Sequence, residues 1–202
     1  MENRAWPTLE GLISSDRNQR EMALEELGMF PDVQDQPLVV YLLATRLFDP
    51  DIQLRFQAVQ MLGNLLAADS TGRRMPERSL KVLAEYTSQM EKGQLIKLLE
   101  VSVNYLAAEE SILEILKLCS YAGKAMGGIL NDRRLPVMIR QQAIYFCGEV
   151  GFLVTMTAIE NLIQRIEKDR NRTGLAASRK KLRDQETLYP YAVAALGKLE
   201  GL

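Results

Sequence analysis

Hydrophobic residues recur at helical spacing along most of this chain, and polar turn residues interrupt the runs. The clearest case lies between residues 37 and 67, where two apolar runs are separated by Asp49, Pro50 and Asp51. Apolar positions three and four residues apart are typical of one face of an amphipathic helix. The pattern predicts a helix, a tight turn and a second helix.

The turn chemistry agrees with this prediction. Asp49 is placed to cap the second helix with its carboxylate, and Pro50 suits a first helical position, where no N–H is needed. Asp51 would then lie near the positive end of the helix dipole.

Three helix starts share the pattern Arg-x-x-Ala-x-x-x-x-Gly. The positions are Arg20, Ala23 and Gly28; Arg55, Ala58 and Gly63; and Arg140, Ala143 and Gly148. We interpret the Arg as one half of an ion pair that fixes the preceding acidic turn, with Asp49 as the partner of Arg55. Ala and Gly indicate a face that a neighbouring helix approaches closely, because Gly otherwise costs about 1 kcal/mol in a helix interior. A pattern repeated at helix starts predicts a repeat architecture.

Two further copies of the repeated pattern are expected, and both are incomplete. The interval from Arg55 to Arg140 is about two repeat lengths, so one copy is expected at Leu99, Ser102 and Ala107. Another is expected at Ala192, Leu196 and Gly197, after a turn at Tyr189 and Pro190. The predicted helices are 7–14, 17–30, 37–48, 52–67, 76–91, 94–107, 109–130 with a bend near Gly123 or Gly127-Gly128, 136–150, 154–170 and 187–200.

The segment from Asp49 to Gly63 resembles the HEAT-repeat family, whose units are pairs of antiparallel helices. The resemblance implies an all-α fold, a right-handed α-α superhelix (solenoid) of about five helix pairs. We expect a single domain over residues 1–202, with units at about 1–33, 34–70, 71–107, 108–151 and 152–202. It also implies a binding function on the concave face of the solenoid.

Composition supports an all-α protein and limits its partners. Hydrophobic residues make up 47% of the chain and aromatic residues 6%, while strong helix formers dominate. A net charge of -1 makes nucleic acid an improbable ligand for the chain as a whole. No signal peptide and no run of about 20 apolar residues is present, so we expect a cytoplasmic protein without membrane insertion. Cys119 and Cys147 have no metal-site spacing, and we expect buried, reduced thiols.

Histidine is absent from the sequence. This excludes Ser-His-Asp and Cys-His catalysis, His-ligated zinc, and the di-iron site of HEAT-like proteins that resemble deoxyhypusine hydroxylase. The acidic pairs Glu25-Glu26, Glu109-Glu110 and Asp49/Asp51 fit solvated faces and helix caps better than acid-base catalysis. We therefore expect no enzymatic activity, no catalytic residue, no cofactor and no metal.

One strongly basic segment departs from the repeat pattern. Residues 165–183 contain eight basic residues and only two acidic ones, Glu167 and Asp169. An enlarged turn is expected around residues 171–174. A solvated loop, a docking site for an acidic protein surface and a phosphate contact are the three interpretations of this segment. The candidate partner-binding residues are Arg165, Lys168, Arg170, Arg172, Arg179, Lys180, Lys181 and Arg183.

The leading functional hypothesis is a non-enzymatic scaffold or adaptor that binds a protein partner of unknown identity on its concave face, with the basic segment aiding electrostatic docking. The alternatives are a HEAT-like protein of the bilin-lyase or chaperone type and a nucleic-acid-binding HEAT-like protein of the DNA-glycosylase type.

Overall fold

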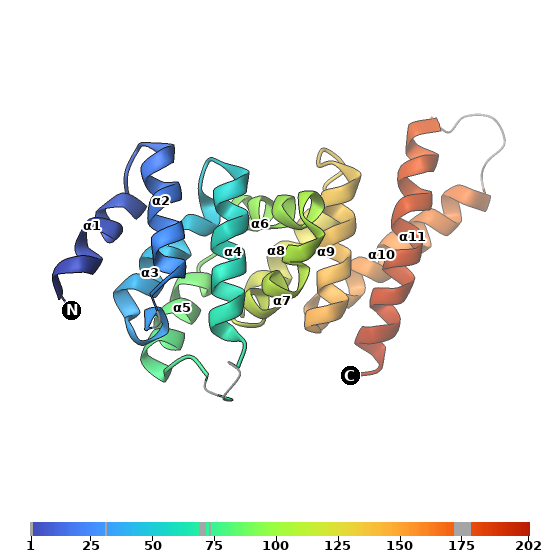
Figure 1. The fold of residues 1–202 in the computed structure, drawn as a ribbon. Coiled ribbons are helices and arrows are strands. Elements are labelled where there is room, and N and C mark those ends of the chain that lie inside the picture. Colours follow the sequence, from blue (N-terminus) through green and yellow to red (C-terminus); the bar gives the residue numbers. More distant parts are fainter. Residues whose placement is uncertain (1, 31, 69–71, 73, 172–178) are drawn as a thin grey trace. The chain divides into compact units, whose positions relative to one another are not determined.

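The structure is a computed structural model that describes residues 2–30, 32–68, 72, 74–171 and 179–202, without the side chains of residues 2–5, 171 and 179–182. The described residues form eleven α-helices and four short 3₁₀ segments, and these parts of the chain contain no strand (Figure 1). The expected all-α class is confirmed. The chain forms two compact units, one of residues 1–90 and 100–120 and the other of residues 91–99 and 121–202.

The first unit is built from helices α1 to α5, the end of α6, and α7. Their bounds are α1 Glu2–Leu12, α2 Arg17–Gly28, α3 Pro37–Thr45, α4 Ile52–Leu66, α5 Glu77–Ser88, α6 Lys92–Asn104 and α7 Glu109–Lys117, with 3₁₀ segments Val33–Asp35, Arg46–Phe48 and Leu106–Ala108. Helix α1 packs on α2 and α3, α3 packs on α5, and α4 packs on both α2 and α7. Helices α1, α3 and α5 therefore contact one another in succession, whereas α4 packs on α2 and on α7.

The second unit contains the start of α6 and four further helices. These are α8 Ala122–Asn131, α9 Val137–Val150, α10 Met156–Asn171 and α11 Arg179–Glu200, with a 3₁₀ segment at Leu153–Thr155. Helix α9 packs on α8 and α11, and α10 packs on α11 and α8. The packing within this unit has the same order, in which α8 contacts α10 and α9 contacts α11.

The turn before α4 differs in one respect from its prediction. The N-cap is Asp51, whose side chain accepts hydrogen bonds from the backbone N–H groups of Gln53 and Leu54. Asp49 lies outside the helix, and its carboxylate accepts from the Asp51 N–H instead. The Asp51 side chain satisfies two of the N–H groups that a helix start leaves without partners.

Two of the three repeat glycines lie where a neighbouring helix leaves no room for a side chain. A Cβ on Gly63 would lie 2.7 Å from the Cα of Ser111, and one on Gly148 would lie 2.8 Å from the Cα of Ala195. These positions confirm the close approach that the pattern predicts. Gly28 is the exception, because nothing would come within 4 Å of an added Cβ there.

Two helix boundaries also differ from the prediction. Residues 109–130 form two helices rather than one bent helix, and the break lies at residues 118–121. Within the break, the thiol of Cys119 donates to the backbone oxygen of Thr87 at 2.8 Å. Gly123 does not break the helix, and it instead allows Phe152 and Val154 to pack closely.

The last helix begins earlier than predicted. Helix α11 starts at Arg179 and runs through Tyr189 and Pro190, where a turn was expected. The enlarged turn around residues 171–174 lies almost wholly outside the described residues. Among the helices that the structure describes, none is long and apolar enough to cross a membrane.

Candidate partner-binding site

The three arginines of the repeated pattern all donate to backbone oxygens. Arg20, Arg55 and Arg140 are all buried. Arg20 donates to the backbone oxygens of Ser14 and Ser15 at 3.1 and 2.9 Å. Arg20 thus donates to two backbone oxygens just before the start of its own helix.

Arg55 donates to the backbone oxygen of Asp49 at 2.8 Å, and Arg140 donates to that of Leu130 at 2.9 Å. A guanidinium carries five N–H donors in a rigid fork, so one of them can fix a turn while others remain for a second partner. The contacts of Arg20 and Arg55 with the turns before their own helices agree with the predicted role. Arg140 instead binds the end of the preceding helix, because Leu130 lies inside α8.

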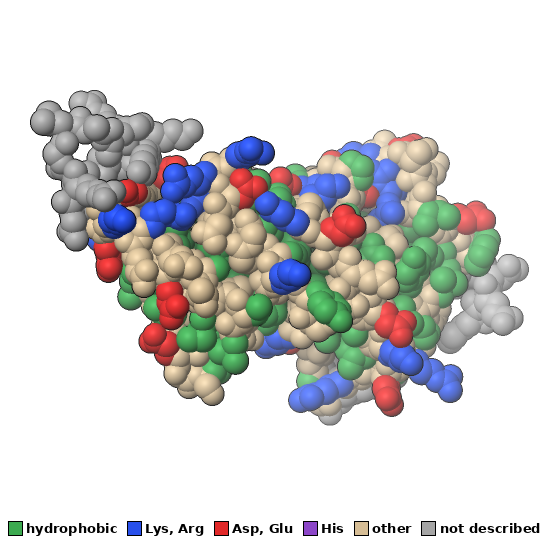
Figure 2. Space-filling view, turned by 180° about the vertical axis from the view of Figure 1, so that it is seen from behind, with side chains coloured by type: hydrophobic (Ala, Val, Ile, Leu, Met, Phe, Trp, Pro, Cys, Tyr) green, Lys and Arg blue, Asp and Glu red, His purple; other side chains and the backbone are tan. Residues whose placement is uncertain are grey.

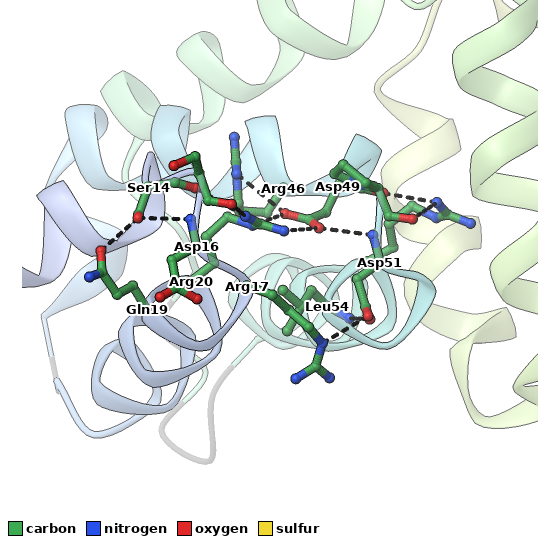
Figure 3. Close-up of polar contacts among 12 residues, drawn as sticks. Ser14, Asp16, Arg17, Gln19, Arg20, Arg46, Asp49, Asp51 and Leu54 are labelled. Carbon is green, nitrogen blue, oxygen red and sulfur yellow. Dashed lines mark hydrogen bonds and ion pairs between the residues drawn. The ribbon is translucent and has the colours of Figure 1, made fainter.

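The Asp49 carboxylate is the centre of a buried ionic cluster in the first unit (Figure 3). Arg20 holds it with two hydrogen bonds, from Nε at 2.7 Å and from a terminal nitrogen at 3.1 Å. Arg46 adds a contact at 3.3 Å, and the Asp49 side chain has no exposed surface. Burial is the largest effect on Arg46 and lowers the pKa of its guanidinium.

The predicted ion pair between Arg55 and Asp49 is wrong in its partner. The Asp49 carboxylate pairs with the arginine of the preceding copy, while Arg55 pairs with Glu100 at 2.9 Å. The acid that each arginine binds is therefore supplied by a later segment of the chain. Glu100 and Arg46 were not among the predicted residues, because neither has a fixed spacing from the repeated pattern.

Arg140 differs from the other two repeat arginines because it forms no ion pair within the described part of the chain. Its one described hydrogen bond is the bond to Leu130. Burial, followed by the like charge of Arg165, lowers the pKa of Arg140. The charges that act on the pKa of Arg140 are those of Arg165 and Arg133, which lower it, and of Asp184 and Asp132, which raise it.

Arg165 lies close to the same end of α8. Its terminal nitrogen is 3.5 Å from Oδ1 of Asn131, next to the residue that accepts from Arg140. Burial and then the positive charge of Arg133 lower the pKa of Arg165. We call Arg133, Arg140 and Arg165 the arginine cluster.

The structure describes four side chains of the predicted basic segment. Arg165 is half-buried, and Lys168, Arg170 and Arg183 are exposed on α10 and α11. Arg172 lies outside the described residues, as do the side chains of Arg179, Lys180 and Lys181 on α11. Figure 2 shows basic, acidic and hydrophobic side chains interspersed on the face that it draws.

Contacts between α10 and α11 fix part of this segment. The Arg170 guanidinium lies 4.2 Å from the centre of the Tyr189 ring, whose hydroxyl donates to Glu167 at 2.9 Å. Gln185 donates to Asp169 at 2.6 Å. Arg170 is therefore engaged within the unit, and Lys168 and Arg183 are the exposed basic side chains with no ion pair among the described residues.

The described residues hold no group of three or more His, Cys, Asp or Glu side chains that suits a metal ion. Cys119 and Cys147 form no disulfide and are buried, as expected from the sequence. The chemistry that the described side chains offer is charge recognition by arginine and lysine.

Comparisons with known proteins add no assignment. No protein family model matches the sequence, and no curated protein matches it. A crystal structure of an engineered protein aligns with 98% of this chain and 97% of its own, with 14% sequence identity and a TM-score of 0.30. That score is too low to indicate a common fold.

Proposed function

We propose that this protein is a non-enzymatic adaptor of HEAT-like, solenoid architecture that binds a protein partner on its concave face. The repeated arginine pattern supports the repeat architecture, as do the contacts between alternate helices, α1 with α3, α3 with α5, α8 with α10 and α9 with α11. Basic side chains of α10 and α11 orient the partner as it docks. Function does not follow from a fold alone, so the proposal depends on these side chains.

The observation on which the binding role rests is the exposure of Lys168 and Arg183 next to a partly buried arginine cluster. Exposed charges at the rim of an interface act mainly on the rate of association and on partner choice. An excess of positive charge selects a partner surface that is acidic.

The test is purification of the protein with its partner from the native cells. Wild-type protein is expected to retain a stoichiometric protein partner, and the double variant Lys168→Glu, Arg183→Glu is expected to lose most of it. Arg78→Glu, Lys81→Glu is the matched control, because both residues are exposed on α5 in the other unit and the charge change is the same. The proposal fails if no protein co-purifies, or if both double variants retain the partner equally.

A salt titration of the isolated complex separates electrostatic docking from apolar docking. Exposed charges are screened within about 10 Å at 0.1 M salt, so the association rate of the wild type is expected to fall as salt rises. A rate that does not change with salt would remove the role assigned to the basic side chains.

A further inference from the structure

Arg140 occupies a position that binds a carboxylate in the other two complete copies. Arg20 binds Asp49 and Arg55 binds Glu100, with nitrogen to oxygen distances of 2.7 and 2.9 Å. Arg140 is buried to the same degree, with 5% of its surface exposed, and has no such partner. Among the residues that the structure describes, no carboxylate forms an ion pair with this guanidinium.

Side chains outside the described part of the second unit do not supply one either. Residues 171–182 contain neither Asp nor Glu, and they add four further basic residues. Asp184 and Asp132 are the two carboxylates whose charges act on Arg140, and neither forms an ion pair with it. Asp132 pairs instead with Lys92 at 2.7 Å.

Two more guanidinium groups lie around the same place. Arg165 reaches Asn131 at the end of α8, beside the Leu130 oxygen that Arg140 binds. Arg133 follows in the turn after α8 and is exposed. Three like charges held together at the end of one helix raise each other's free energy, and a bound anion relieves this repulsion.

The Asp49 cluster shows what the arginine cluster lacks. There, two arginines hold a single buried carboxylate, which has a bidentate contact with Arg20 and a contact with Arg46. A planar guanidinium fork matches a carboxylate in this way. The charges of Asp132, Asp169 and Asp184 act on the arginine cluster, but among the described residues none of its three arginines forms an ion pair.

We propose that Arg133, Arg140 and Arg165 form a binding site for a carboxylate side chain of an acidic peptide segment in the protein partner. The site deepens the adaptor function proposed above and rests on it. An incoming acidic segment first meets the exposed Arg133 and the half-buried Arg165, and Arg140 supplies a fixed positive charge at the base of the site. Lys168 and Arg183 lie outside the cluster and act on approach.

The test is the binding of a fluorescein-labelled peptide that contains four consecutive Asp and Glu residues, followed by fluorescence anisotropy. The same peptide with Asn and Gln in those positions is the neutral comparison. We expect the full-length protein to bind the acidic peptide and not the neutral one. Arg133→Gln and Arg165→Gln are each expected to weaken binding about tenfold, because a charged contact of this kind is lost.

Lys124→Gln is the matched control, since Lys124 is exposed on α8 and its removal changes the net charge by the same amount. It is expected to change the affinity less than twofold. The proposal would be overturned if Arg133→Gln, Arg165→Gln and Lys124→Gln changed the peptide affinity equally. It would also be overturned if the wild type did not bind the acidic peptide. Arg140→Gln also removes the hydrogen bond to Leu130, so its thermal stability is measured alongside its peptide affinity. If Arg140→Gln unfolds, Arg133→Gln still tests the proposal.

Inorganic phosphate separates the two anions that arginines prefer. We expect millimolar phosphate at constant ionic strength to leave peptide binding unchanged. If phosphate displaces the peptide from the wild type, and this displacement is absent in Arg165→Gln, the site binds phosphate. That result would overturn the carboxylate assignment. The peptide titration needs no native partner, so its failure is distinct from a failure to co-purify one.

Discussion

The carboxylate of Asp49 accepts two hydrogen bonds from the guanidinium of Arg20, a residue 29 positions earlier in the chain. The pair joins the start of α2 to the turn before α4, and Arg46 approaches the same carboxylate. The arrangement satisfies the carboxylate, which has no exposed surface. One acid thereby fixes two copies of the repeated pattern relative to each other within the first unit.

Asp49→Asn is expected to destabilise the protein strongly. The substitution leaves Arg20 and Arg46 without their common anion in a buried site, and the loss of one partner of a buried ion pair costs about 3–5 kcal/mol. Urea unfolding followed by circular dichroism measures this loss as a lower midpoint.

Asp132→Asn is the control for this prediction. Asp132 pairs with Lys92 at 2.7 Å, but both side chains are partly exposed, and water screens such a pair. Its loss is expected to shift the midpoint by a small fraction of the Asp49 effect. Equal shifts of the urea midpoint in Asp49→Asn and Asp132→Asn would mean that burial of the Asp49 cluster adds nothing to its effect on stability.

Gly63→Ala and Gly28→Ala are expected to have opposite signs. The added methyl at residue 63 would meet Ser111, with 2.7 Å to its Cα, and such overpacking costs about 1–3 kcal/mol. At residue 28 the methyl meets nothing, and the loss of chain entropy in the unfolded state stabilises by about 0.4–1 kcal/mol. The free energies of unfolding of the two variants in urea decide the matter, and a destabilising Gly28→Ala would contradict the prediction.

Much of the helical structure follows from local sequence patterns. The predicted helices at 52–67 and 136–150 agree with α4 and α9 to within a residue at each end. Both begin after Pro or Asp residues, which limit a helix start by the geometry of the chain and by capping. Local information of this kind is present in a single segment of sequence.

Contacts between segments were not accessible in the same way. The sequence indicates that Asp49 and Arg55 belong to one turn, but the pair that forms joins Asp49 to Arg20 and Arg55 to Glu100. Both partners lie at variable distances along the chain, so spacing does not select them. Arg133 was not predicted as a site residue for the same reason. It comes near Arg165 of the basic segment through the packing of α8 on α10.

The glycines show a third limit of sequence reasoning. Gly63 and Gly28 occupy the same position of the repeated pattern, yet only Gly63 contacts a neighbouring helix closely. The HEAT resemblance, the solenoid and the adaptor function remain predictions.

Stability at acid pH is expected to depend on the pair of Asp51 and Arg17. The Arg17 hydrogen bond, at 2.9 Å, is the largest cause that lowers the pKa of Asp51 below its ordinary value of 3.8. A carboxyl whose folded pKa is depressed stabilises the protein above its unfolded pKa, and this contribution is lost as the pH falls below 3.8 toward the folded pKa.

Asp51→Asn and Arg17→Gln are therefore both expected to flatten the fall of the urea midpoint below that pH. Asn keeps the capping oxygen of the α4 start, so the first variant isolates the charge. Glu85→Gln, an exposed residue of α5 without an ion pair among the described residues, serves as control. An unchanged slope in both test variants would rule out the assigned role.

The two cysteines are expected to report the unfolding of the two units separately. Cys119 lies in the first unit and Cys147 in the second, and both side chains are buried. Burial raises the pKa of Cys147 to about 12, so only about one thiol in ten thousand is the reactive thiolate at pH 8. In the variant Cys119→Ala, Cys147 is expected to react with a disulfide reagent only as the second unit opens in urea.

The variant Cys147→Ala tests the first unit in the same way. The Cys119 thiol donates to Thr87 within that unit, so Cys119 is expected to react only as the first unit unfolds. Reaction of either thiol in the absence of urea at the rate of free cysteine would contradict the burial on which the prediction rests.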